Sequence, residues 1–81
     1  MNMEESLFKH IRYSLGGGEY AYYAATSSMK VCLRKDMNVS CLVFCEGDRV
    51  SIGHGLRPVA KFKMSDPAED IVKKLKELLD Q

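Results

Sequence analysis

Two stretches of the chain carry apolar residues at the spacing of an amphipathic helix. The first stripe runs over residues 3–15 and consists of Met3, Leu7, Phe8, Ile11 and Leu15. The glycines at 16–18 end this helix, because glycine adopts the left-handed C-terminal conformation without a side-chain clash. The second stripe consists of Ile71, Val72, Leu75, Leu78 and Leu79. It follows Asp66 and Pro67, which favour a helix start as N-cap and first helical residue.

Between the helices the pattern alternates with the period of a β-strand, and two turns set the strand register. Residues 46–49 (Glu-Gly-Asp-Arg) match a hairpin with a two-residue Gly-Asp loop, which pairs Val43 with Ile52. A three-residue loop at 36–38 pairs Val31 with Val43. Both registers direct the same side of the sheet toward the core. That side comprises Met29, Val31, Leu33, Val39, Cys41, Val43, Cys45, Val50 and Ile52.

The outer strands are placed by a loop at 27–28 and by a proline. The loop directs Tyr22 and Ala24 to the core side and Tyr23 away from it. Pro58 marks the last strand as a sheet edge, because proline cannot donate to a strand ladder. The inward residues of that strand are Ala60, Phe62 and Met64.

The expected fold class is α+β, in a single domain over residues 1–81 with the order α-β-β-β-β-(β)-α. An N-terminal helix, a four- to five-stranded antiparallel meander sheet and a C-terminal helix make up this domain. Each helix has only one apolar stripe, so we expect both helices to cover the same sheet face.

The sheet face opposite the helices is expected to be open to water. Its apolar centre consists of Tyr23, Cys32, Leu42 and Phe44, with basic residues around it. A solvated face would alternate toward polar residues, whereas contiguous apolar surface with a polar rim is typical of interaction sites. The predicted partner-binding residues are Tyr23, Lys30, Arg34, Leu42, Phe44, Arg49, Lys61 and Lys63. A helix on this face, or a register shifted by one residue, would give the opposite assignment.

The composition and the net charge limit the cellular compartment and the classes of partner that we expect for this chain. The chain has 81 residues, with 12 Lys or Arg against 11 Asp or Glu and a net charge of +1. This balance excludes a strongly basic nucleic-acid coat and an acidic mimic of DNA. Three cysteines, an odd number, argue against a secreted disulfide framework. With no signal peptide and no apolar run near the roughly 20 residues that span a bilayer, we expect a cytoplasmic protein without a membrane partner.

The residues that could carry chemistry form no recognisable site. Cys41 and Cys45 are four positions apart, which on a strand separates them by roughly 13 Å, too far to share one zinc ion. His10 and His54 have no nucleophile or acid at a catalytic spacing. We therefore predict no metal, no cofactor and no catalytic residue, and we expect that the chain is not an enzyme.

These observations favour a non-catalytic protein-binding module, a small adaptor or inhibitor that docks a larger macromolecule through the open sheet face or an edge strand. A phage- or mobile-element-encoded inhibitor of a host enzyme is one concrete form. The alternative is a single-stranded nucleic-acid-binding domain, in which Tyr23 and Phe44 stack on bases and the basic residues contact phosphates. A homodimer built sheet to sheet would use the same face.

Overall fold

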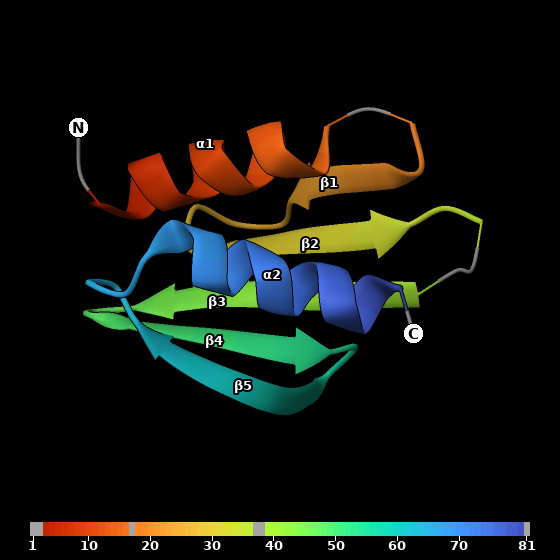
Figure 1. The fold of residues 1–81 in the computed structure, drawn as a ribbon. Coiled ribbons are helices and arrows are strands. Elements are labelled where there is room, and N and C mark those ends of the chain that lie inside the picture. Colours follow the sequence, from red (N-terminus) through yellow and green to blue (C-terminus); the bar gives the residue numbers. More distant parts are fainter. Residues whose placement is uncertain (1–2, 17, 37–38, 81) are drawn as a thin grey trace.

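The chain forms a helix, a five-stranded antiparallel sheet and a second helix (Figure 1). The computed structural model describes residues 3–16, 18–36 and 39–80. The elements are α1 (Met3–Leu15), β1 (Tyr20–Ala24), β2 (Met29–Arg34), β3 (Val39–Glu46), β4 (Arg49–His54), β5 (Arg57–Lys63) and α2 (Ala68–Leu79). The strands are neighbours in chain order, which confirms the predicted meander sheet. Within the described ranges no helix has the length and apolar character needed to cross a membrane.

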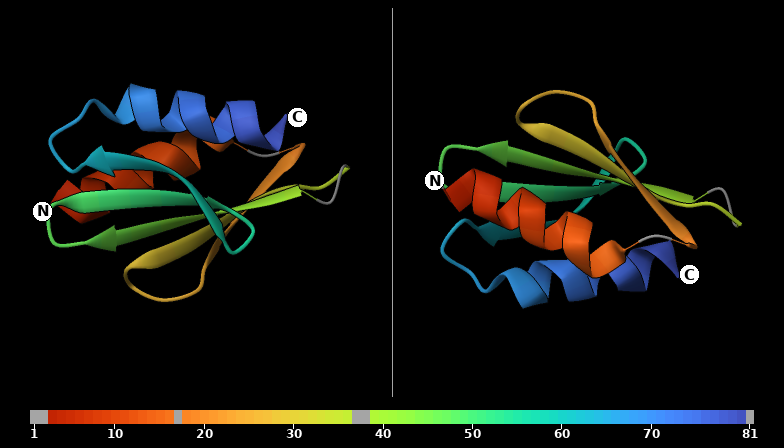
Figure 2. Two further views of the ribbon diagram at one scale, coloured as in Figure 1. Left: turned by 90° about the horizontal axis from the view of Figure 1, so that it is seen from below. Right: turned by 90° about the horizontal axis from the view of Figure 1, so that it is seen from above.

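Both helices lie on one face of the sheet, and the other face carries no helix or strand among the described residues (Figure 2). The buried side chains between the layers are Leu7, Phe8, Ile11 and Leu15 from α1, Ile71, Val72, Leu75, Leu78 and Leu79 from α2, and Cys32, Cys41, Val43, Cys45, Val50 and Ile52 from the sheet. The two helical stripes of the sequence are therefore the buried faces of α1 and α2. Met3 is the exception, since its side chain is 57% exposed.

The β3–β4 hairpin has the register that its Gly-Asp turn predicts. Val43 lies opposite Ile52, and Gly47 takes a φ of +60°, which glycine adopts readily in a two-residue hairpin turn. The prediction for β5 is also confirmed. Phe62 packs against the core from this strand, and Pro58 lies at the sheet edge.

The predicted register of β2 is wrong by one residue, so the two faces of this strand are exchanged. Arg34 lies opposite Val39, and Cys32 lies opposite Cys41. Lys30, Cys32 and Arg34 therefore point to the helix side, where Cys32 is fully buried. The residues predicted to be buried lie on the open side instead: Met29, Val31 and Leu33.

The length of the β2–β3 connection explains this shift. Four residues, 35–38, connect the paired ends Arg34 and Val39, in place of the three predicted at 36–38. Two of those three, Met37 and Asn38, lie outside the described residues. One additional loop residue moves every side chain of β2 to the opposite face, because the side-chain period of a strand is two.

The start of α2 also differs from the prediction. Asp66 is not the N-cap, because Pro67 occupies that position and α2 has no side-chain cap hydrogen bond. Asp66 instead closes the end of β5. Its carboxylate accepts a hydrogen bond from the Lys63 N–H at 2.8 Å, and its own N–H donates to the Lys63 carbonyl oxygen at 2.9 Å.

Candidate functional site

Six side chains form an apolar patch across the centre of the open face of the sheet. They are Tyr23 from β1, Met29, Val31 and Leu33 from β2, and Leu42 and Phe44 from β3. Tyr23, Val31 and Leu42 form one row across three strands. Met29 and Phe44 form the neighbouring row. Side chains directly opposite one another in a sheet lie about 5 Å apart, so the rows make one continuous surface.

The apolar patch is not part of the hydrophobic core. None of its six residues belongs to the buried cluster or packs against it. Tyr23 is 57% exposed and Phe44 is 39% exposed, and the other four are half-buried. Burial of apolar surface stabilises a protein by roughly 25 cal/mol per Å². Because these six side chains keep part of their surface in water, folding of the single chain gains only part of this free energy.

A shallow hollow of about 290 Å³ lies beside the apolar patch. Met29, Leu42 and Phe44 line it from the patch, and Leu56 and Pro58 line it from the side of β5. Leu56 is 92% exposed in the turn between β4 and β5. The hollow therefore extends the apolar surface of the sheet toward this turn.

Gly53 allows the β4–β5 turn to form beside this hollow. The strand pairing shifts between Ile52 and Gly53, as at a β-bulge. A Cβ at Gly53 would lie 3.0 Å from the Gly55 carbonyl oxygen and 3.2 Å from the Arg57 carbonyl oxygen. Both are backbone atoms, so a side chain at this position would displace the turn.

Charged side chains border the apolar patch on the side of β4 and β5. Arg49 lies opposite Glu46 on β3 and opposite Lys63 on β5, which gives one charged row. Lys61 lies opposite Ser51 in the next row. Three cations and one carboxylate make this rim basic.

The structure brings most of the predicted binding residues together on the open face. These are Tyr23, Leu42, Phe44, Arg49, Lys61 and Lys63. The prediction that Lys30 and Arg34 lie on this face is wrong, because both belong to the helix side of β2. The same register error assigns three members of the apolar patch to the core side: Met29, Val31 and Leu33. Leu56 is missed because a single apolar residue in a turn carries no periodic signal.

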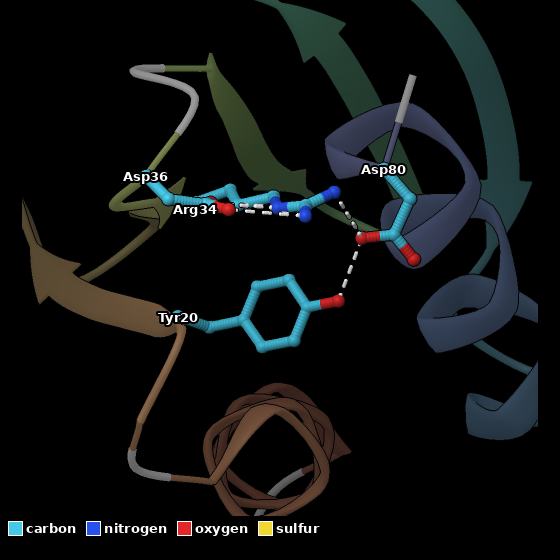
Figure 3. Close-up of polar contacts among 4 residues, drawn as sticks. All are labelled: Tyr20, Arg34, Asp36 and Asp80. Atoms are coloured by element: carbon cyan, nitrogen blue, oxygen red, sulfur yellow. Dashed lines mark hydrogen bonds and ion pairs between the residues drawn. The ribbon is translucent and has the colours of Figure 1, made fainter.

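Arg34 belongs to a polar cluster that connects the end of α2 to β1 and β2 (Figure 3). Its Nε and Nη2 donate to the two carboxylate oxygens of Asp36 at 2.8 and 3.1 Å, and its Nη1 donates to Asp80 Oδ1 at 3.2 Å. The Tyr20 hydroxyl donates to the same Asp80 oxygen at 2.7 Å. The hydrogen bond to Asp80 raises the pKa of Tyr20, and the hydrogen bond to Asp36 raises the pKa of Arg34. Arg34 is thus occupied within the fold.

We expect Asp80→Ala to lower the melting temperature by a few degrees, because it removes the shared acceptor of Arg34 and Tyr20. Glu77→Ala is the matched control, since Glu77 lies on the same helix and its Oε2 is 4.0 Å from Lys74 Nζ. Thermal unfolding followed by circular dichroism measures both. Equal shifts in the two variants would show that the cluster does not hold the end of α2.

Lys30 is also engaged within the fold. Its Nζ lies 4.8 Å from the centroid of the Phe8 ring of α1, and it donates a hydrogen bond to the Thr26 carbonyl oxygen at 2.8 Å. The first contact is a cation–π interaction. The aliphatic stem of a lysine can pack on apolar surface while its ammonium reaches polar partners, which explains a lysine on the helix side.

The three thiols are free and buried in the core. Burial raises the pKa of Cys32 to about 12 and the pKa values of Cys41 and Cys45 to about 11. Nucleophilic attack and metal binding both require the thiolate, so these side chains are unreactive at neutral pH. In the parts of the chain that the structure describes, no group of three or more His, Cys, Asp or Glu side chains is placed to hold a metal ion.

We expect the free energy of unfolding to fall as the pH rises from about 9 toward 12. The ordinary thiol pKa is 9.0, and that of Cys32 in the fold is about 12, so the folded chain binds more protons than the unfolded chain in this window. Below pH 9 both states are protonated and this contribution to stability is complete. Urea unfolding at stepped pH should show a flatter alkaline loss in Cys32→Ala than in the wild type. Identical slopes would show that the Cys32 thiol does not contribute to the alkaline loss of stability.

Comparisons of the chain with protein-family models, with curated proteins and with solved structures found no match.

Proposed function

We propose that this chain is a non-catalytic protein-binding module that docks another protein through the open face of its sheet. The observation that carries the proposal is the apolar patch, which lies outside the core and beside a basic rim. Protein interfaces share this plan of an apolar centre with aromatic and methionine side chains inside a polar border. A contiguous patch that the single chain leaves in water is best explained by a partner that covers it.

The chemistry of the open face favours a protein over single-stranded nucleic acid. Lys30 and Arg34, two of the cations expected along a nucleic-acid backbone, lie on the helix side, and Glu46 stands in the rim. β2 presents aliphatic side chains in their place, and these cannot stack on bases as aromatic platforms do. The nucleic-acid alternative retains only the stacking groups Tyr23 and Phe44 and three cations.

The partner should present an apolar surface to the patch and carboxylates to the rim. Leu42 and Phe44 are the central anchors, because they line the hollow and also lie opposite the β2 residues of the apolar patch. Arg49, Lys61 and Lys63 would face the acidic groups and set the orientation of the complex. Such a module acts by binding alone, as an adaptor or as an inhibitor, including one encoded by a phage or mobile element against a host enzyme.

A photo-crosslinking amino acid at position 44 tests this function in the source cell. The matched control carries the same group at position 13, where Tyr13 is 88% exposed on α1. We expect a discrete protein adduct from position 44 and none from position 13. An adduct that nuclease removes would assign the face to nucleic acid, and adducts of equal yield at both positions would contradict a docking role of the open face.

A further inference from the structure

The two edges of the sheet differ in their protection against pairing with another strand. An unprotected edge presents free N–H and C=O groups to any approaching strand, and proteins block such edges with charges, prolines and bulges. β5 has all three devices: the cations Lys61 and Lys63, the proline Pro58 and the shifted pairing at Gly53. In addition, Asp66 binds both the N–H and the C=O of Lys63. These features therefore block the β5 edge against pairing with another strand.

β1 forms the opposite edge and has none of these devices. Its sequence is Tyr-Ala-Tyr-Tyr-Ala, without a charge or a proline, and its pairing with β2 runs without a shift from Tyr20 to Ala24. Ala24 is exposed, and Tyr22 is half-buried. In the right-hand view of Figure 2 the edge of β1 faces the viewer, with α1 beside it on the helix side.

The hydrogen bonds at the ends of β1 show which of its backbone groups are unpaired. Lys35 N–H donates to the Glu19 carbonyl oxygen, and Ala25 N–H donates to the Met29 carbonyl oxygen. Alternate residues of an antiparallel strand bond to the same neighbour, so the odd-numbered residues of β1 bond to β2. The N–H and C=O groups that point away from the sheet belong to Tyr20, Tyr22 and Ala24.

The flank of α1 beside this edge carries charges in a self-complementary order. A groove of about 410 Å³ lies between this flank and β1, and Tyr22 and Ala24 line it from the strand. Glu4 lines the groove in the first turn of α1, and Lys9 and Arg12 line it further along the helix. A two-fold axis normal to the sheet would set two copies of α1 antiparallel, with Glu4 of one toward Arg12 of the other.

We infer that two copies of this chain associate by antiparallel pairing of their β1 strands. The register that uses every unpaired group is centred on Tyr22, with Tyr20 opposite Ala24 of the second copy, and it forms about six N–H···O=C bonds. The uncharged β1 pairs with itself without repulsion, whereas self-pairing of β5 would oppose its lysines. The two sheets join into one, and Tyr23 of the apolar patch becomes a neighbour of Ala21 of the second copy.

This association does not depend on the proposed function, since it uses the edge of the sheet rather than its open face. It would place two copies of the apolar patch on one continuous surface, related by a two-fold axis. A partner with two equivalent sites would then bind with higher avidity than a single patch allows.

Sedimentation equilibrium of the full chain over a wide concentration range tests the inference. We expect a reversible monomer–dimer equilibrium, and Ala24→Pro should weaken it by about tenfold or more, because proline removes one outward donor from each copy. Ala24→Ser is the matched control, since it keeps the N–H and should keep the dimer. A wild-type chain that is monomeric at all concentrations would overturn the inference, as would an Ala24→Pro variant that dimerises equally well.

Amide hydrogen exchange locates the interface even if the proline variant folds poorly. In the wild-type dimer the amides of Tyr20, Tyr22 and Ala24 should exchange more slowly at high than at low protein concentration. The amide of Lys61 on the β5 edge should show no such dependence. A concentration dependence at β5 without one at β1 would place the contact elsewhere and contradict β1 pairing.

Discussion

Val43→Glu should unfold the protein, whereas the same substitution at the adjacent residue, Phe44→Glu, should leave it folded. Val43 is fully buried beneath the helices, and its cross-strand neighbour Lys30 already contacts the Thr26 carbonyl oxygen and the Phe8 ring, so a carboxylate at position 43 would lose its water without a free cation. Burial of an unpaired charge costs several kcal/mol, comparable with the roughly 5–15 kcal/mol that stabilises a domain of this kind. Phe44 is 39% exposed on the open face, so a carboxylate there keeps its water. The expected loss is about 1 kcal/mol.

Far-ultraviolet circular dichroism and urea unfolding of the two purified variants measure this difference. Unfolding of both variants would show that the open face is needed for the fold. A folded Val43→Glu variant would show that the helices do not cover β3 as described.

The second large effect is expected on β2, where it distinguishes the observed register from the one predicted from sequence. Cys32→Asp should unfold the protein, because Cys32 is fully buried opposite Cys41. Leu33→Asp should be tolerated, with a loss of about 1 kcal/mol, because Leu33 is half-buried on the open face. The register with a three-residue loop at 36–38 gives the opposite result for each variant. The same urea titrations decide between the two registers.

The parts of the fold that the sequence predicts are those in which one local signal dominates. The helical stripes of α1 and α2 extend over three turns or more, and such a long period has no competing interpretation. The Gly-Asp turn at 47–48 sets the register of β3 and β4 because its loop has only two residues. These sequence features alone predict that Val43 and Ile52 lie in the core.

β2 could not be placed in the same way, because both of its faces have an apolar character. One face carries Met29, Val31 and Leu33, and the other carries Cys32 between two cations. A rule that buries the more apolar face selects the wrong one. Two of the contacts that these cations make on the helix side join residues far apart in the chain: Lys30 with Phe8, and Arg34 with Asp80 at a separation of 46 positions.

The sequence predicts the residues of the candidate site on those strands for which it also predicts the register. Leu42 and Phe44 follow from the β3–β4 turn, and Lys61 and Lys63 follow from the alternation of β5. The contribution of β2 and the hollow beside Leu56 were not predicted, because they depend on a loop length and on a bulge at Gly53. The structure therefore makes the open face more apolar than the sequence suggested.

The most direct test of the central claim compares the stability of Phe44→Glu with its ability to capture a partner from the source cell. The control is Tyr13→Glu on the exposed side of α1, where Tyr13 is 88% exposed. We predict that both variants unfold within about 1 kcal/mol of the wild type and that only Phe44→Glu loses the captured partner. A Phe44→Glu variant that is folded and retains its partner at the wild-type level would contradict the assignment of the open sheet face as the docking surface.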